Sequence, residues 1–253
     1  MLDILYARWK QGHRTMRYPA GPPPELPPRF AGRPTLDAAR CNRCQECVKV
    51  CPTAAIAPTQ DRLELDLGRC LFCRACQDAC SPGAVAFTPE YRLAARQRDD
   101  LMVRPDSPLP SAGLEGRLKK LFGRSLKLRQ VSAGGCNACE ADTNVLGTVG
   151  WDLGRFGIQF VASPRHADGL LITGPVSKNM ALALRKTYDA VPSPKIVIAL
   201  GACAISGGPY AGHGETCGGA EAVVPVDLFI AGCPPHPLTI LEGLLALLGR
   251  LPS

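Results

Sequence analysis

Two cysteine runs with the same spacing constrain this chain more than any other feature of its sequence. CNRCQECVKVCP begins at Cys41 and CLFCRACQDACSP begins at Cys70, and together they hold eight of the 13 cysteines. In this C-x-x-C-x-x-C-x-x-x-C pattern, three closely spaced cysteines bind one iron–sulfur cluster and the fourth cysteine binds the other cluster of the pair. The repeat therefore predicts two [4Fe–4S] clusters whose ligand sets are exchanged between the two runs.

The same rule assigns a ligand set to each of the two clusters. The first is expected to be bound by Cys41, Cys44, Cys47 and Cys80, and the second by Cys70, Cys73, Cys76 and Cys51. Ser81 separates the last cysteine from the following proline, and we expect this insertion to shift the turn there. Two structural zinc sites are the alternative, but zinc has no use for a repeated three-plus-one pattern with a trailing proline.

Residues 36–90, including the tails CPTAAI and CSPGAV, resemble bacterial-type ferredoxins with two [4Fe–4S] clusters. The resemblance implies a small α+β domain, to which we assign residues 36–97. A module of about 55 residues buries little apolar core, so bonds to the clusters are expected to supply the missing stability.

Basic charge is concentrated in two segments that flank this domain. The whole chain has a net charge of +7, and residues 1–35 carry six basic and two acidic residues. We expect residues 1–35 to be a basic, proline-rich docking arm, made of a weakly amphipathic helix and the extended stretch AGPPPELPPRFAGRP. The arm would lie along a partner subunit or an anionic membrane surface, and a solvated tail is the alternative.

Residues 98–126 contain no cysteine and are expected to be a linker. A basic run begins in this segment, and its members are Arg117, Lys119, Lys120, Arg124 and Lys127. We expect a solvated face here, with docking to an acidic partner as the alternative.

Residues 127–253 show a different pattern, in which short apolar runs alternate with helical stretches. The runs KLRQVSA, IQFVAS, DGLLITG, KIVIALG and DLFIAG are typical of strands that are buried on both faces of a parallel sheet. SKNMALALRKTYDAV and the segment from Pro237 to Leu248 indicate helices. The predicted fold class is therefore α/β, with a doubly wound parallel-sheet domain preceded by the small α+β ferredoxin domain.

Four of the five remaining cysteines lie where these strands are expected to end. Cys136 and Cys139 follow the first strand, Cys203 follows the fourth and Cys233 follows the fifth. Because ligands bind outside the carboxyl ends of parallel strands, we expect these four cysteines to bind a third [4Fe–4S] cluster. Cys217, in the glycine-rich loop HGETCGG, is expected to be a small buried hydrophobe.

Within about residues 125–250, the segments GGCNACE, SPRHADGLLITGPV, GACAISGG and GCPPHP carry a second resemblance. They resemble the small iron–sulfur subunit shared by membrane-bound energy-converting [NiFe] hydrogenases, including the formate hydrogenlyase type, and by respiratory complex I. This resemblance implies a flavodoxin-like domain whose four cysteines bind the proximal cluster beside the active site of a large subunit. Complex I subunits have adjacent cysteines where Cys136 and Cys139 are separated by two residues, as in hydrogenases, so the hydrogenase branch is favoured.

The resemblance also implies roles for residues near the third cluster. It places SPRHAD near the large subunit, where Arg165 or His166 would tune the cluster or a proton relay. A hydrogen-bonded structural role for this segment, which includes Asp168, is the alternative. Glu140 would pass protons towards the partner's site, or would place its negative charge at the start of the following helix.

These observations predict an iron–sulfur electron-transfer subunit of an oxidoreductase complex, with no complete catalytic site on this chain. Electrons would pass through three clusters between a donor protein (formate dehydrogenase, ferredoxin or CO dehydrogenase) and a hydrogenase-like large subunit, in a complex with membrane-embedded subunits. The alternative is the equivalent subunit of a nickel-free, quinone-reducing complex I-like oxidoreductase. A zinc-stabilised binding module is a more distant alternative.

Composition excludes several other classes of protein. Aromatic residues make up only 6% of the chain, which is low for a protein that binds single-stranded nucleic acid by stacking its bases on aromatic side chains. No nucleic-acid partner is therefore expected. The first residues lack the features of a signal peptide, and LTILEGLLALLG is shorter than the ~18 residues of a membrane span. Thirteen cysteines are too sparse for a disulfide scaffold, so the thiols are expected to be reduced. We therefore expect a peripheral protein on the cytoplasmic side of the cell membrane.

Overall fold

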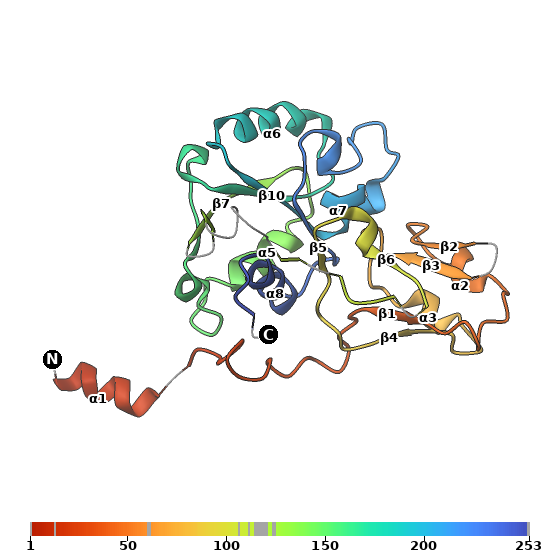
Figure 1. Cartoon of the computed structure of the whole chain (residues 1–253), viewed down its shortest axis with the longest axis horizontal. Helices are drawn as coiled ribbons and strands as arrows, with labels where there is room; N and C mark the ends of the chain where they lie inside the picture. Colours follow the sequence, from red (N-terminus) through yellow and green to blue (C-terminus); the bar gives the residue numbers. More distant parts are fainter. Residues whose placement is uncertain are drawn as a thin grey trace.

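The architecture consists of a small antiparallel region and a larger, mostly parallel sheet covered by helices (Figure 1). The computed structural model describes residues 2–12, 14–59, 62–105, 107–110, 112–113, 121–122 and 125–251. Of the basic run in the expected linker, Arg117, Lys119, Lys120 and Arg124 lie outside these residues.

The ferredoxin-like region contains two copies of a strand–helix–strand unit. The first copy is β1 (Pro34–Leu36), α2 (Glu46–Lys49) and β2 (Ile56–Pro58), and the second is β3 (Leu63–Asp66), α3 (Ala75–Asp78) and β4 (Val85–Phe87). The copies exchange strands, because β1 pairs antiparallel with β4 and β2 pairs antiparallel with β3. A further strand, β6 (Met102–Val103), comes from the segment expected to be a linker and pairs with β3.

The turn after the last cysteine has the same geometry in both copies. The Ala55 N–H donates to Cys51 Sγ at 3.2 Å, and the Ala84 N–H donates to Cys80 Sγ at 3.2 Å. The expectation that Ser81 shifts this turn is wrong. The donor lies four residues after the cysteine in both copies, so Ser81 replaces the first proline without adding a residue.

The larger sheet has six strands in the order β5-β11-β10-β9-β7-β8. Its mutually parallel strands are β7 (Leu126–Ser132), β8 (Ile158–Phe160), β9 (Gly169–Thr173), β10 (Ile196–Leu200) and β11 (Leu228–Ile230). Counted in chain order, these strands lie in the sequence 2-1-3-4-5, which is the flavodoxin order. Strands β9, β10 and β11 are buried throughout, as both faces of the sheet are covered. The expected fold class is therefore confirmed.

Helices cover both faces of this sheet. In Figure 1, α6 (Lys178–Ala190) lies on one face, and α5 (Ala138–Val145) and α8 (Pro237–Leu247) lie on the other. The short helix α7 (Gly201–Ser206) follows β10 directly. Single-turn 3-10 helices are η1 (Arg98–Leu101), η2 (Leu153–Phe156), η3 (Pro164–His166), η4 (Gly208–Tyr210) and η5 (Ala220–Ala222).

A two-residue strand joins the two regions. β5 (Ala94–Ala95) follows the ferredoxin-like region and pairs antiparallel with β11 at the edge of the larger sheet. One apolar core continues across the joint, because Leu65 and Leu101 belong to the same buried cluster as Ile205 and Phe229. The two regions therefore share a sheet and a core.

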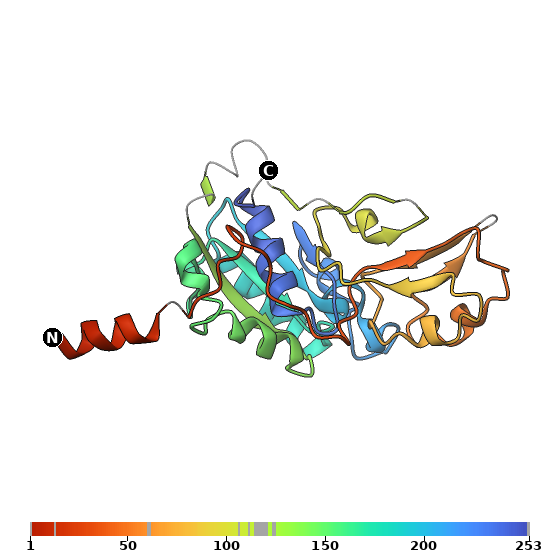
Figure 2. The same ribbon diagram turned by 90° about the horizontal axis from the view of Figure 1, so that it is seen from below.

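The N-terminal arm has an exposed part and a packed part. Helix α1 (Leu2–Gln11) projects from the body and has no buried residue (Figures 1 and 2). Figure 2 shows the following segment passing α8 on its way to the ferredoxin-like region. Tyr18 is buried there, and the Arg33 N–H donates to the Glu90 carbonyl at 2.8 Å. Within the described residues, no helix has both the length and the apolar character needed to cross a bilayer.

Glu242 lies on α8 inside the apolar core and is only 5% exposed. Burial raises the pKa of its carboxyl to about 7, against the opposing effect of Arg92 and with a further upward effect from Glu90. An unfolded glutamate titrates near pH 4.3. The folded chain therefore binds more protons than the unfolded chain between about pH 4.3 and about pH 7, and its stability falls as the pH rises across this window.

We predict that Glu242→Gln abolishes this loss of stability. Above about pH 7 the variant should exceed the wild type in unfolding free energy by up to about 3 kcal/mol, because the buried charge is gone. Anaerobic urea unfolding between about pH 5 and about pH 8 measures the difference. Glu221→Gln, at an exposed position, is the control. Parallel pH profiles for the wild type and Glu242→Gln would contradict the prediction.

Candidate metal centres

Three cysteines of the first run and one of the second lie together; we call Cys41, Cys44, Cys47 and Cys80 site 1. Burial raises the pKa of the Cys47 thiol, and the neighbouring thiols of Cys80, Cys41 and Cys44 raise it further. Cys47 is buried on α2, whereas Cys44 is exposed on the preceding loop. The structure thus brings together the four residues that the spacing grouped as the first ligand set.

The second set gathers in the same way; we call Cys51, Cys70, Cys73 and Cys76 site 2. Burial raises the pKa of Cys70 to about 12, the Phe72 N–H opposes this shift, and the thiols of Cys76, Cys51 and Cys73 add to it. Burial raises the pKa of Cys76 to about 11. All four cysteines line one cavity.

Left-handed residues wrap the backbone around these thiols. Between the cysteines of the runs, Arg43, Gln45, Phe72 and Arg74 all have φ near +60°. Because such a backbone turns successive N–H groups towards one side, it suits an anionic group. The Phe72 N–H donates to Cys70 Sγ at 3.3 Å. The sequence did not reveal these residues, since none is the glycine or asparagine usually found at positive φ.

The third set comes from the segments that follow the carboxyl ends of three strands, and it includes Cys139 on α5 and Cys203 on α7; we call Cys136, Cys139, Cys203 and Cys233 site 3. Burial raises the pKa of Cys139, and Glu140 and then the thiols of Cys203, Cys233 and Cys136 raise it further. Cys203 is raised to a pKa of about 11, with burial as the main cause. These segments follow β7, β10 and β11, as the sequence analysis expected.

Glycines allow the backbone to approach the sulfurs of site 3. Gly201 has φ +86°, and a Cβ there would lie 2.7 Å from Cys139 Sγ. Gly208 has φ +52°, and a Cβ there would lie 3.0 Å from Cys203 Sγ. Both glycines are required by the close packing of the chain around these thiols.

Sites 2 and 3 are adjacent. The pKa of Cys233 is raised by burial, by Cys136 of its own site and by Cys73 of site 2. A cavity at this junction is lined by Phe72 of the second cysteine run and by Cys233, together with Phe30 of the arm. Site 2, which shares the exchanged cysteine repeats with site 1, is therefore the neighbour of site 3.

The donor set of each site fits an iron–sulfur cluster. No disulfide is formed, and every site offers four thiols, which is the ligand set of a [4Fe–4S] cluster. Backbone N–H groups already point at sulfurs of sites 1 and 2, the kind of hydrogen bond that tunes a bound cluster. Among the described residues, no three Cys, His, Asp or Glu side chains converge as they would around a single metal ion.

Cys217 lies apart from the three sites. Its side chain is partly buried and packs against the core, and its N–H donates to the Val176 carbonyl at 2.8 Å. The side chain expected to be a small buried hydrophobe therefore packs against the core but is only partly buried.

Glu140 is fixed by hydrogen bonds at the ends of two strands. It is 7% exposed, and Oε1 accepts a hydrogen bond from Thr173 Oγ1 at 2.6 Å. Burial raises the pKa of its carboxyl, but hydrogen bonds from Ser132 and Thr173 outweigh this effect and the net shift is downward. An ionised carboxylate in this position ties α5 to the sheet.

The segment SPRHAD does not lie beside site 3. η3, which carries Arg165 and His166, precedes β9, whereas the cysteines of site 3 follow the parallel strands. The whole length of β9 separates them, and both side chains are exposed. Asp168 Oδ2 accepts a hydrogen bond from the Lys127 N–H at 2.7 Å. This position favours the structural role that the sequence analysis weighed for the segment over tuning of the third cluster by Arg165 or His166.

Strand-exchanged cysteine repeats, joined to a flavodoxin-like sheet with four cysteines at its strand ends, define an iron–sulfur protein. Residues 33–81 match the family model of the 4Fe–4S dicluster domain, and residues 136–247 match that of the NADH ubiquinone oxidoreductase 20 kDa subunit. The chain belongs to the family of this 20 kDa subunit, with a 4Fe–4S dicluster domain on its amino-terminal side.

Curated relatives support this membership. The chain is 41% identical over 135 residues to the probable membrane-bound hydrogenase subunit mbhJ of Pyrococcus furiosus, covering 53% of this chain and 81% of that protein. It is 42% identical over 142 residues to formate hydrogenlyase subunit 7 of Escherichia coli K12, covering 55% of each. A solved chain of an archaeal membrane-bound sulfane sulfur reductase is 33% identical, with a TM-score of 0.46, covering 53% of this chain and 74% of that one. The protein is thus an iron–sulfur subunit of the hydrogenase and complex I class of oxidoreductases.

We predict that Gly201→Ala removes the cluster of site 3 alone. The new Cβ would displace Cys139 Sγ, so the iron content of the anaerobically purified chain should fall from about twelve to about eight per chain. Gly212→Ala is the matched control, because Gly212 also has a positive φ of +78° but a Cβ there would meet nothing within 4 Å. Full iron and sulfide content in Gly201→Ala would contradict the prediction.

Proposed function

We propose that this chain relays electrons through three [4Fe–4S] clusters to the active site of a large subunit, within a membrane-bound complex of the hydrogenase or formate hydrogenlyase kind. The observation that carries the proposal is the gathering of twelve thiols into three sites of four. The ligands would be Cys41, Cys44, Cys47 and Cys80 at site 1, Cys51, Cys70, Cys73 and Cys76 at site 2, and Cys136, Cys139, Cys203 and Cys233 at site 3.

The adjacency of sites 2 and 3 supports an order of the three sites along the proposed relay. Cys73 lies near Cys233, so site 2 is the neighbour of site 3 and site 1 is the distal end. A donor protein (a formate dehydrogenase module, a ferredoxin or a CO dehydrogenase) would deliver electrons at site 1, where Cys44 is exposed. Each step moves one electron, so that one site is oxidised as the next is reduced.

The exposure of site 3 supports its place beside the large subunit. Cys136 and Cys233 are exposed at the carboxyl edge of the sheet, although their partners Cys139 and Cys203 are partly buried. A cluster bound there supplies one-electron chemistry, and this chain's part is to bind it, to exclude water on one side and to present the other side to the partner. The substrate chemistry belongs to the large subunit.

The spacing of Cys136 and Cys139 favours a nickel-containing large subunit over the quinone-reducing alternative. The names of two relatives, a membrane-bound hydrogenase subunit and a formate hydrogenlyase subunit, point the same way.

We predict that the intact complex purified with this chain contains nickel and evolves hydrogen from a reduced donor. An intact large subunit without nickel that reduces quinone would establish the complex I-like alternative. Zinc without acid-labile sulfide in this chain would overturn the iron–sulfur proposal itself.

We also propose that α1 places the chain at the cytoplasmic face of the membrane. Leu2, Leu5, Tyr6 and Trp9 form one stripe at helical spacing, and each is more than half exposed. Basic residues accompany this stripe, namely Arg8, Lys10, Arg14 and Arg17. An apolar stripe with aromatic residues and adjoining positive charge suits an anionic lipid surface.

We predict that the full chain binds phosphatidylglycerol vesicles more tightly than phosphatidylcholine vesicles, and that added salt weakens the binding. The double variant Leu5→Ala/Trp9→Ala should bind at least about tenfold more weakly in cosedimentation, because it loses most of the apolar stripe. Leu182→Ala removes an equally exposed leucine from α6 and should bind normally. Equal binding to both lipids, or unchanged binding of the double variant, would contradict the role of the arm.

A further inference from the structure

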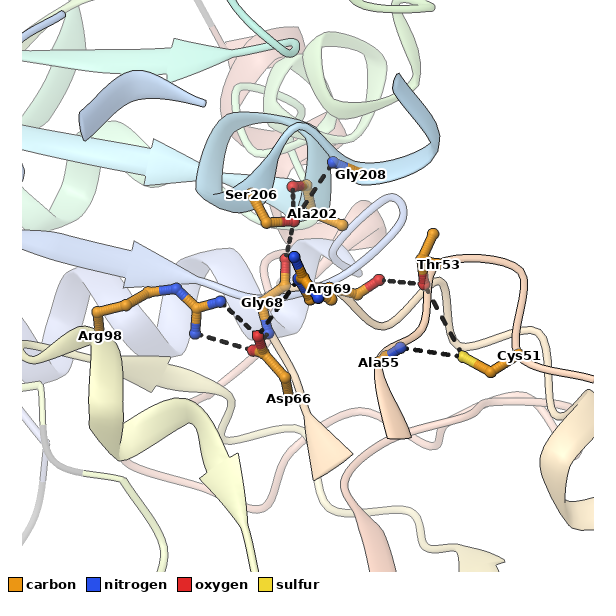
Figure 3. Close-up of polar contacts among 10 residues, drawn as sticks. All are labelled: Cys51, Thr53, Ala55, Asp66, Gly68, Arg69, Arg98, Ala202, Ser206 and Gly208. Atoms are coloured by element: carbon orange, nitrogen blue, oxygen red, sulfur yellow. Dashed lines mark hydrogen bonds and ion pairs between the residues drawn. The ribbon is translucent and has the colours of Figure 1, made fainter. Parts of the chain in front are cut away.

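The turn that leads into the second cysteine run is held by a two-point ion pair. Arg98 Nη1 donates to Asp66 Oδ1 at 2.8 Å, and Nη2 donates to Oδ2 at 2.6 Å (Figure 3). The Gly68 N–H also donates to Asp66 Oδ1, at 2.8 Å. Because Arg98 opens η1, just after β5, the ion pair ties the turn to the segment that leaves the larger sheet and leads to β6.

A hydroxyl of the larger domain completes the contact. Ser206 Oγ on α7 donates to the Gly68 carbonyl at 2.8 Å, lies 3.1 Å from the Ala202 carbonyl, and accepts from the Gly208 N–H at 3.3 Å (Figure 3). Gly68 lies two residues before Cys70 of site 2, and Ser206 lies three residues after Cys203 of site 3. One hydrogen bond therefore connects the turn before Cys70 of site 2 with α7, the helix that carries Cys203 of site 3.

Residue 68 has no room for a side chain. A Cβ at Gly68 would lie 2.7 Å from Ile205 Cγ2 and 2.8 Å from Arg98 Cζ. Ile205 precedes the serine on α7 and is buried in the core that spans both regions. The turn is therefore pressed directly against α7, and glycine is what permits the close approach.

The same turn is also bound to the remaining ligand of site 2. The Asp66 N–H donates to the Ala55 carbonyl at 2.8 Å, while the Ala55 N–H donates to Cys51 Sγ. Thr53 Oγ1 donates to the Arg69 carbonyl at 2.7 Å (Figure 3). A displacement of this turn relative to α7 would consequently also displace Cys51 and Cys70, two of the four cysteines of site 2.

We propose that Asp66, Gly68, Arg98 and Ser206 form a lock that fixes site 2 at one distance and orientation from site 3. The inference rests on the proposed relay and specifies which residues set its second step. Electron tunnelling falls steeply with distance, so a joint that loosens slows the transfer between these sites even when every cluster remains bound. The four are positioning residues, since none of them is a ligand.

Partial burial makes the ion pair effective as part of this lock. The side chains of Arg98 and Asp66 are 27% and 14% exposed, and their two parallel hydrogen bonds define an orientation as well as an attraction. Ser206 adds a contact from the opposite domain. Together they restrain the joint from both sides, whereas the pairing of β5 with β11 restrains it along the sheet edge.

The lock is tested on the full chain with three variants. Ser206→Ala removes the crossing hydroxyl, Arg98→Lys removes the paired geometry, and Gly68→Ala inserts a wedge between the turn and α7. Gly214→Ala is the control, because a Cβ at that glycine meets nothing within 4 Å and its φ is not positive. Each protein is reduced anaerobically, its iron is quantified and its low-temperature EPR spectrum is recorded.

We expect all variants to retain wild-type iron while the spin–spin interaction between the clusters of sites 2 and 3 weakens, most strongly in Gly68→Ala. Gly214→Ala should keep the wild-type spectrum. Hydrogen exchange of the segment 66–70 should rise about fivefold in Ser206→Ala, as expected for the loss of one hydrogen bond.

Two results are decisive against the lock. Full iron with an unchanged spin–spin interaction in Ser206→Ala and Arg98→Lys would overturn it, even if Gly68→Ala fails to fold. Faster exchange without a change in the spectrum would also overturn it, because the residues would then be merely structural. A wild-type chain without iron would instead overturn the proposed function, so the two failures are distinguishable.

Discussion

Burial of thiols that form no disulfide is the constraint on which the rest of this structure depends. Burial is the main cause of a raised pKa at Cys70, which reaches about 12, and at Cys139, and the neighbouring thiols add to it; both effects oppose ionisation. A metal centre reverses this preference, since it binds the thiolate and releases the proton. The free energy of cluster binding is then part of the free energy of folding, as expected for a small region with little core of its own.

The two cysteine repeats exchange both strands and cysteines with each other. Strand β1 pairs with β4 and β2 with β3, while Cys51 and Cys80 each join the thiols of the other copy. Neither copy can close a sheet or complete a site alone. The ferredoxin-like region therefore forms as a single cooperative unit rather than as two independent halves.

Spacing and strand punctuation in the sequence predicted the three cysteine groups that the fold brings together and the doubly wound α/β class, whereas the flavodoxin-like domain was expected from the family resemblance. These patterns did not predict β5 and β6, because a strand of two residues is too short to show an alternation of apolar and polar side chains. Contact between Ser206 and Gly68 joins a hydroxyl to a carbonyl 138 residues away, and local patterns do not encode such contacts. The direction of β9 places Arg165 and His166 at the end of the strand opposite site 3, which the family resemblance alone did not reveal.

The joint between the ferredoxin-like region and the larger sheet fixes how the two regions are oriented. The alignment with the relative mbhJ covers 81% of that protein but only 53% of this chain. This chain therefore contains a ferredoxin-like region in addition to the part that aligns with mbhJ. A flexible tether would raise the effective concentration of the two parts without orienting them. Strand β5 and the shared core instead define their orientation. Since site 2 lies next to site 3 at this joint, the joint sets the relative position of the two sites between which the proposed relay would pass electrons.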